Sequence, residues 1–260
     1  MNSEKLPISV VLIAHNEAHN IRRCLDSIAS WVSEIIVVVN DCTDGTDAIA
    51  RSYGAKIFEH PWHGHRDQKN IAIGYATQSW ILQVDADEEV SDELRGSIIT
   101  FIEENDLLYA GAYFPRKVWF LGQWIKHGDW YPDYSLRLFR RGAGICIGSH
   151  EHDTIKLNGK AKKLKGDLHH YTYPSLNAQI PKIAIFGDYY LKRMLEAKTP
   201  WNSWAVAFRS LWRFFRAYFL RLGFLDGFPG FYIAFYQGFA TLFRHAKLYE
   251  HLNKDIHPTL

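Results

Sequence analysis

The sequence predicts an α/β protein built on a mixed sheet flanked by helices, followed by an aromatic-rich helical C-terminal region. Three observations carry this prediction. Apolar β-branched runs alternate with amphipathic segments over residues 6–110, and strand-like runs punctuated by aromatic and glycine residues follow from about residue 111. Helical periodicity then dominates after Pro174. At 260 residues, the chain is long enough to bury one full core with a smaller appendage.

Composition narrows the class of protein. The chain has 30 Lys and Arg against 28 Asp and Glu, so no overall basic field predicts a nucleic-acid partner. Aromatic residues make up 15% of the chain, an excess that needs a core, a partner surface or a membrane interface. The three cysteines lack CxxC spacing, which favours reduced thiols in the cytosol, and the first residues do not have the pattern of a secretory signal.

The first part of the chain alternates predicted strands with predicted helices. The strands are continuous apolar runs, as expected of strands buried on both faces, and the helices have apolar residues on one side. The strands are 8–14, 34–39, 56–58 and 80–84, and the helices are 17–30, 45–52, 65–77 and a segment that starts at Ser91. This order is typical of a parallel, doubly wound sheet, whose ligands bind at the carboxyl ends of the strands.

Two aspartates directly follow the fourth predicted strand. Alternate residues of an extended segment point the same way, so the carboxylates of Asp85 and Asp87 can reach one hard divalent cation such as Mg²⁺ or Mn²⁺. The alternative is a capping role in a surface turn. The neighbouring Glu88 and Glu89 are expected to be helix-start or solvated charges, with a contribution to the cation site as the alternative.

Polar side chains also follow the first two predicted strands. No GxGxxG is present after the first strand, so Asn16 and Glu17 are expected to contact a ribose or base through their side chains. The alternative is that Asn16 caps the helix beginning at Glu17. In the next loop, Asp44 is expected to cap a helix, while Asp41 is freer to accept a hydrogen bond from a base.

The order of these segments resembles the family 2 glycosyltransferases. The resemblance is carried by AHNE after the first strand, NDCTDGT after the second, QKN in a helix and DAD after the fourth, and it covers roughly residues 6–120. The second loop is one residue shorter than the family's usual DSGSTDGT, which leaves Asn40 and Asp41 as alternatives for the base contact. The later segments YPDYSLRLFRR, SHEHD and LKGDLHHYTY are similar to the branch that adds glucose to lipopolysaccharide core.

The resemblance implies a GT-A fold and inverting transfer of a sugar, glucose by expectation, from a UDP-sugar. It also implies Mg²⁺ or Mn²⁺ at Asp85 and Asp87. The general base that takes the acceptor proton is expected to be Glu151, at the family's His-Glu position, with Asp153 and Asp133 as alternatives. Glu151 as a structural partner of an arginine is a further alternative. The implied nucleotide-sugar site comprises Ala14, Asn16, Glu17, Asp41, Lys69, Asp85 and Arg137. Arg137 or Arg140 is expected to contact the diphosphate, whose oxygens the guanidinium fork suits, and a structural role for either is the alternative.

Four histidines lie near the end of this region. Their HxH and HH spacings do not match a helix-borne zinc pair. His169 or His170 is an alternative ligand for the cation at Asp87. Structural or solvated roles are the other expectation for the histidines. The four are His150, His152, His169 and His170.

The segment from Trp204 to Leu222 combines aromatic residues with an arginine stripe. Aromatics beside arginines suit a helix lying in a membrane interface. A helix packed on the catalytic domain with solvated arginines is the alternative. Gly227–Phe243 has no charged residue but is interrupted by Pro229 and glycines, so it predicts a monotopic or re-entrant contact. The stripe is Arg209, Arg213 and Arg216, and the apolar face is Phe208, Trp212, Phe215 and Phe219.

Together these patterns predict a GT-A catalytic domain at 1–174, with a nucleotide-sugar half at 6–110 and an acceptor half at 111–174, and a helical membrane-associating region at 175–260. The leading hypothesis is a metal-dependent glycosyltransferase acting on a lipid-linked saccharide, such as lipopolysaccharide or lipooligosaccharide core. It is expected at the cytoplasmic face of the bacterial inner membrane, as a peripheral or monotopic protein. A nucleotidyltransferase and a non-catalytic membrane-binding module with an inactive GT-A domain are the alternatives.

Overall fold

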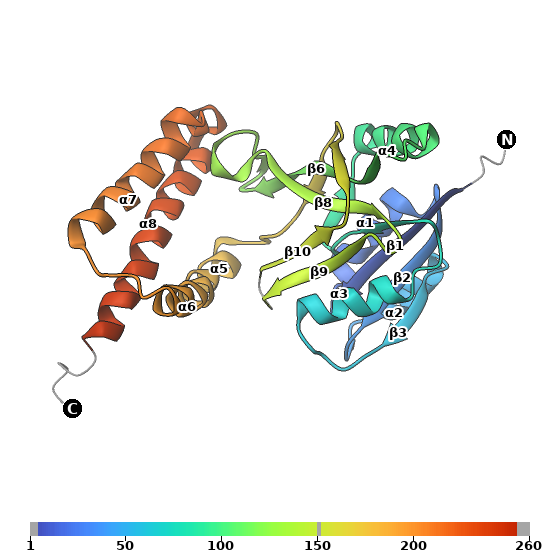
Figure 1. Ribbon diagram of the computed structural model, residues 1–260, viewed down its shortest axis with the longest axis horizontal. Coiled ribbons are helices and arrows are strands. Elements are labelled where there is room, and N and C mark those ends of the chain that lie inside the picture. The colour runs from blue at the N-terminus through green and yellow to red at the C-terminus, as the bar shows by residue number, and fades with distance from the viewer. Residues whose placement is uncertain (1–4, 150–151, 254–260) are drawn as a thin grey trace. The chain divides into compact units, whose positions relative to one another are not determined.

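The computed structural model describes residues 5–149 and 152–253 (Figure 1). The chain divides into two compact units. Unit 1 comprises Met1–Lys117 and Asp133–Tyr171, and unit 2 comprises Val118–Pro132 and Thr172–Leu260. The predicted domain boundary after residue 174 stays a prediction, and the structure adds that 118–132 belongs to the same compact unit as the C-terminal helices.

Unit 1 contains a mixed sheet. Its strands are β1 Leu6–Ala14, β2 Val32–Val39, β3 Lys56–Glu59, β4 Trp80–Gln83, β5 Glu88–Val90, β6 Tyr109–Phe120, β8 Asp133–Arg140, β11 Lys160–Lys163 and β12 Leu168–His170. Among the described residues the order is β3-β2-β1-β4-β8-β6-β12-β5, with β11 paired to β6. The first four strands in this order are parallel, and β8 pairs antiparallel with both β4 and β6. The predicted mixed α/β fold is therefore confirmed.

The helices of unit 1 follow the predicted alternation. They are α1 Ala18–Ile28, α2 Thr46–Ser52, α3 His65–Gly74 and α4 Asp92–Glu104. The predicted apolar side of α1 is buried, with Ile21, Leu25 and Ile28 fully enclosed. Alternate residues of β1 enter two different core clusters, because successive side chains of a strand point to opposite faces. A separate antiparallel pair is formed by β9 Gly144–Ser149 and β10 His152–Leu157.

Unit 2 is helical, as predicted for the region after Pro174. Its elements are β7 Gln123–Trp124, η1 Gly128–Trp130, α5 Leu176–Gln179, α6 Pro181–Glu196, α7 Ser203–Phe215, η2 Arg216–Leu220, η3 Gly223–Asp226 and α8 Gly227–Leu252, together with the end of β6. Helices α7 and α8 run antiparallel and side by side (Figure 1). The rings of Trp201 and Tyr249 lie 4.9 Å apart at one end, and those of Phe214 and Phe231 lie 6.0 Å apart toward the other. Within the described residues, no helix combines the length and apolarity that a membrane crossing needs.

Candidate active site

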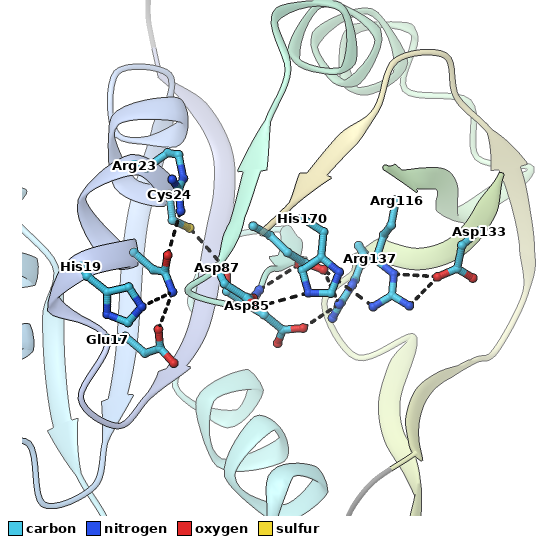
Figure 2. Close-up of polar contacts among 12 residues, drawn as sticks. Glu17, His19, Arg23, Cys24, Asp85, Asp87, Arg116, Asp133, Arg137 and His170 are labelled. Carbon is cyan, nitrogen blue, oxygen red and sulfur yellow. Dashed lines mark hydrogen bonds and ion pairs between the residues drawn. The ribbon is translucent and has the colours of Figure 1, made fainter. Parts of the chain in front are cut away.

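Strand pairing brings Asp87 next to His170. Strands β5 and β12 are antiparallel with Glu88 opposite His170, and the backbone N–H of Tyr171 donates to the carbonyl of Asp87 at 3.0 Å. As a result, His170 Nε2 lies 3.3 Å from Asp87 Oδ2 (Figure 2). The preceding His169 lies instead near Glu89, with Nδ1 3.9 Å from Oε2. Of the two histidines that the sequence left open at Asp87, the structure places His170 there.

The carboxylate of Asp85 is held between two cations. Its Oδ1 lies 2.9 Å from Lys69 Nζ, and its Oδ2 accepts from Arg137 Nη2 at 2.7 Å. The atoms packed around Asp85 would raise its pKa, but Arg137 and Lys69 hold the pKa well below its ordinary value. Asp85 is therefore an ionised group whose two oxygens already face cations, and three residues predicted for the donor site lie together.

Glu88 is part of this network, and its predicted role as a helix-start or solvated charge is wrong. Its side chain is buried, and its Oε2 accepts from the backbone N–H of Asp85 at 2.9 Å. Its Oε1 accepts from Arg137 Nη2 at 2.8 Å. Burial raises the pKa of Glu88. The sequence does not show this position, because Glu88 lies on the unpredicted strand β5 and its partner Arg137 comes from β8.

The two alternatives for the general base are both engaged by cations. Asp153 Oδ2 lies 2.9 Å from Lys69 Nζ. Burial alone would raise the pKa of Asp153, but the Lys69 ammonium lowers it below the ordinary value. Asp133 accepts from Arg116 Nε at 2.9 Å (Figure 2). The predicted base, Glu151, lies outside the described residues.

Hydrogen bonds join the loops after β1 and β2. The Asn16 side-chain oxygen accepts from the backbone N–H of Thr43 at 2.8 Å, so Asn16 ties the two loops together and is not a helix cap. The N–H of Glu17 donates to Thr46 Oγ1 at 2.8 Å. Asp44 accepts from Thr46 N and from Ala18 N, which places its carboxylate at the start of both α1 and α2, while Gly45 occupies the N-cap position of α2.

The remaining predicted donor residues lie on or beside these loops. Glu17 is partly buried, and its Oε2 accepts from Asn20 at 2.9 Å. Burial is the main cause of its raised pKa. Asp41 is exposed and has a left-handed backbone with φ 43°. The carbonyl of Ala14 accepts from Asn40 N at 3.3 Å, which holds the ends of β1 and β2 together.

The Asp87–His170 pair has the chemistry of a partial metal site. Octahedral Mg²⁺ binds ligands at about 2.1 Å, which puts neighbouring ligand atoms about 3 Å apart. The 3.3 Å between His170 Nε2 and Asp87 Oδ2 fits two such ligands. Within the described ranges there is no cluster of three or more His, Cys, Asp or Glu suited to a metal, so the zinc interpretation has no support there. Phosphate oxygens of a bound donor are ligands that Mg²⁺ sites in proteins commonly use.

Several known proteins are similar to this chain in sequence. The model of the family described as "Glycosyl transferase family 2" matches residues 9–156. An uncharacterized glycosyltransferase of Rickettsia bellii is 32% identical over 94% of the chain and 86% of its own length. The lipopolysaccharide core biosynthesis glycosyltransferase LpsC of Rhizobium meliloti is 26% identical over 95% of the chain and 93% of its own length.

Among solved structures, residues 1–349 of S. aureus TarS in complex with UDP-GlcNAc are similar, with a TM-score of 0.49 and 14% identity over 96% of the chain and 92% of the TarS chain. The family model spans more than half of the chain, including the strand ends that carry Asp85 and Asp87. The chain therefore belongs to glycosyl transferase family 2 and is a glycosyltransferase.

Proposed function

We propose that the enzyme transfers a sugar, with inversion at the anomeric carbon, from a UDP-sugar to a lipid-linked saccharide in a reaction that requires Mg²⁺ or Mn²⁺. One observation carries the proposal: the Asp87–His170 pair lies at the strand ends beside the ionised Asp85 and its two cations. The likeness to a lipopolysaccharide core glycosyltransferase over nearly the whole chain supports a saccharide acceptor of that class. Glucose is the proposed sugar, and the cytoplasmic face of the inner membrane is the proposed location.

Asp87 and His170 are the proposed ligands of the divalent cation. When bound, such a cation neutralises the negative charge that develops on the leaving diphosphate. The sequence also predicts Asp85 as a ligand. Because its two oxygens face Lys69 and Arg137, we propose that Asp85 chiefly fixes these two side chains beside the diphosphate. A planar guanidinium such as that of Arg137 suits phosphate oxygens.

The loops after β1 and β2 are the proposed site of the nucleoside. The Oδ2 of Asp41 accepts a hydrogen bond from Asn40 Nδ2 at 3.0 Å. Because Asp41 is exposed, its carboxylate can also accept a hydrogen bond from a base N–H. Glu17 is partly buried. Its proposed role is to contact a ribose hydroxyl through its carboxylate. Asn16 holds the two loops together through Thr43 and thereby shapes this site.

Glu151 is the proposed general base. Its support is the resemblance of Ser149-His150-Glu151 to the family's His-Glu motif. The Lys69 ammonium lowers the pKa of Asp153 against the opposing effect of burial, which makes Asp153 a weaker base. The Asp133 carboxylate is engaged by Arg116. Glu151→Gln should keep UDP-sugar binding and reduce transfer by about a hundredfold or more. Full transfer by this variant would return the role to Asp153 or Asp133.

The main experiment measures UDP release from a panel of UDP-sugars, with and without Mg²⁺ or Mn²⁺, using purified enzyme and an isolated lipooligosaccharide acceptor. Asp87→Asn and His170→Gln should each lower kcat by at least about a hundredfold and weaken the metal dependence. His169→Gln is the matched control, because His169 adjoins His170 on β12 but lies near Glu89. Turnover that survives chelation, with all three variants alike, would contradict the proposal.

A second measurement separates the two views of Asp85. Titration of Mn²⁺ into the enzyme with bound UDP reports the metal affinity directly. Under our proposal, Asp85→Asn leaves the metal affinity within about threefold of wild type and lowers UDP affinity, whereas Asp87→Asn lowers the metal affinity. An equal loss of metal affinity in both variants would identify Asp85 as a ligand.

A further inference from the structure

Exposed large apolar residues recur along both helices of the α7–α8 hairpin. On α7 the exposed positions recur at helical spacing, and Trp204 is 85% exposed, Phe208 67% and Leu211 71%. On α8 the same holds for Phe228, which is 68% exposed, and Phe235, which is 61% exposed. We call the whole set the outer face: Trp204, Phe208, Leu211, Trp212, Phe215, Phe219, Leu220, Leu222, Phe224, Leu225, Phe228, Phe231, Phe235, Phe239 and Leu242.

The inner side of the hairpin is packed through small residues. A Cβ on Gly238 would lie 3.0 Å from the carbonyl oxygen of Ser210, and one on Gly230 would lie 1.9 Å from that of Gly223. Ala217 and Ala234 are buried in the same unit. Helices in water usually pack against each other through large apolar residues and expose polar ones. Here small residues lie between the helices and large apolar residues lie outside, which is typical of helices that pack within lipid. The hairpin is therefore built to have its large side chains against an apolar medium.

Two aspartate side chains buried in unit 2 are held by basic side chains and backbone N–H groups. Asp129, whose side chain is 1% exposed, lies 2.8 Å from Arg213 Nε and 2.8 Å from Arg216 Nη2. Asp226 is buried and accepts from His127 N at 2.8 Å. Two of the three arginines in the predicted stripe thus hold the fold of unit 2 together. These two arginines are paired with a carboxylate, which differs from the predicted alternative of solvated arginines on a packed helix.

Unit 2 carries the net positive charge of the chain. It has twelve Lys and Arg against six Asp and Glu, a formal charge of +6, which leaves −4 for unit 1. Exposed basic groups near the outer face include Arg209 and Arg221. An apolar aromatic face on a strongly basic unit is complementary to an anionic bilayer surface. Self-association through the same face would bring two +6 units together, which Coulomb repulsion opposes.

From these observations we infer that the outer face of the α7–α8 hairpin is a membrane-docking surface that inserts its aromatic and leucine side chains into the interface of an anionic bilayer. The two tryptophans, Trp204 and Trp212, suit the level of the headgroups. The Arg213 and Arg216 pairs with Asp129 keep the hairpin in the shape that presents this face. Docking through this face requires no particular donor, acceptor or metal.

The test is flotation of the purified full-length enzyme with vesicles of phosphatidylglycerol and phosphatidylethanolamine, compared with phosphatidylcholine alone. Wild type should float with the anionic vesicles and bind less well as salt is raised. The triple variant Phe208→Ser, Leu211→Ser, Phe228→Ser should bind about a hundredfold less tightly or worse. The matched control is Leu107→Ser with Leu108→Ser, which changes residues 82% and 53% exposed in unit 1 and should leave binding unchanged.

Two further readouts separate membrane docking from misfolding and from self-association. The triple variant should melt within a few degrees of wild type and release UDP from its donor in solution at the wild-type rate, because the changed side chains are exposed and outside the catalytic site. Wild type that fails to float, or a triple variant that floats like wild type, would overturn the inference. A dimer in analytical ultracentrifugation that the triple variant dissociates, with no flotation of wild type, would identify a second copy as the occupant and would overturn it equally.

Discussion

Each unit contains an aspartate held by basic side chains, and the two clusters differ in their charge balance. In unit 1, the Asp85 side chain is 26% exposed, and its partners Lys69 and Arg137 each contact a second carboxylate, Asp153 and Glu88. In unit 2, the Asp129 side chain is 1% exposed and faces three arginines. The first cluster has a carboxylate for every cation, and its Lys69 and Arg137 side chains are each 6% exposed. In the second cluster a single buried carboxylate faces three arginines that are 33–48% exposed.

This difference indicates what each cluster does. A network in which every cation keeps two partners tolerates the loss or exchange of one contact, which suits a site where a diphosphate comes and goes. A single buried carboxylate among several guanidinium groups is expensive to remove, because its loss leaves three neighbouring positive charges without the carboxylate that they share. We therefore expect the unit 1 cluster to matter most for activity and the unit 2 cluster to matter most for stability.

The largest expected effect on stability comes from Asp129→Asn. This change keeps the shape of the side chain but leaves Arg213 and Arg216 without a carboxylate at 2.8 Å. The free energy of unfolding should fall by about 3 kcal/mol, the lower end of the range for breaking a buried ion pair from one side, because the arginine side chains are a third to a half exposed. Urea denaturation followed by far-UV circular dichroism measures it. An effect no larger than that of Asp85→Asn would remove the distinction between the two clusters.

A smaller loss is expected from filling the tight contact inside the hairpin. In Gly230→Ala, the new Cβ would lie 1.9 Å from the backbone oxygen of Gly223, so the hairpin must shift. We expect a loss of about 1–3 kcal/mol in the free energy of unfolding. Gly74→Ala in α3 of unit 1 is the control, because a Cβ there meets nothing within 4 Å. Equal stability of the two variants would show that the hairpin is loosely packed.

The next effect concerns the acid dependence of the unit 1 cluster. The pKa of Asp85 is held below its ordinary value of 3.8 by Arg137 and Lys69, against the opposing effect of burial. The stability that Asp85 contributes is therefore fully present above pH 3.8 and is lost as the pH falls below that value toward the lowered pKa. Above pH 3.8, Asp85→Asn should cost about 1.5 kcal/mol, near the lower end for hydrogen bonds to charged groups.

Urea denaturation of wild type and Asp85→Asn at several pH values between neutrality and acid measures this difference. The gap between the two proteins should shrink as the pH is lowered below 3.8. A gap that is constant with pH would mean that Asp85 is not the ionised centre of the cluster.

Local sequence patterns were sufficient for the predicted strands and for the position of Asp85 and Asp87. The apolar runs that become β1, β2 and β4 are buried on both faces, so they stand out in the sequence, and the residues after them necessarily lie at one edge of a parallel sheet. The amphipathic pattern of α1 likewise identifies its buried side. These are short-range features in which spacing and burial correspond directly.

Pairings between distant segments could not be predicted in this way. Strand β5 has three residues and no apolar pattern, so neither the burial of Glu88 nor the choice of His170 over His169 can be found from spacing. Asp129 lies in a short 3₁₀ turn, and nothing in its neighbourhood indicates that it meets Arg213 and Arg216 of α7 and η2. The sequence pattern identified the arginine stripe, but the group that Arg213 and Arg216 face is the distant Asp129 carboxylate.

The smallest expected effect tests whether Asn16 acts by shaping the nucleoside loops. Its side-chain oxygen accepts from Thr43 N at 2.8 Å, and its backbone has φ 56°, a left-handed conformation that asparagine tolerates better than alanine. Asn16→Ala should cost about 1 kcal/mol of stability and raise KM for the UDP-sugar by up to about tenfold while kcat stays near wild type. Asn16→Gly removes the same hydrogen bond without the backbone strain, so it should be the more stable variant with a similar KM. Steady-state kinetics with varied donor separates the two contributions, and a fall in kcat without a change in KM would place Asn16 in the chemical step instead.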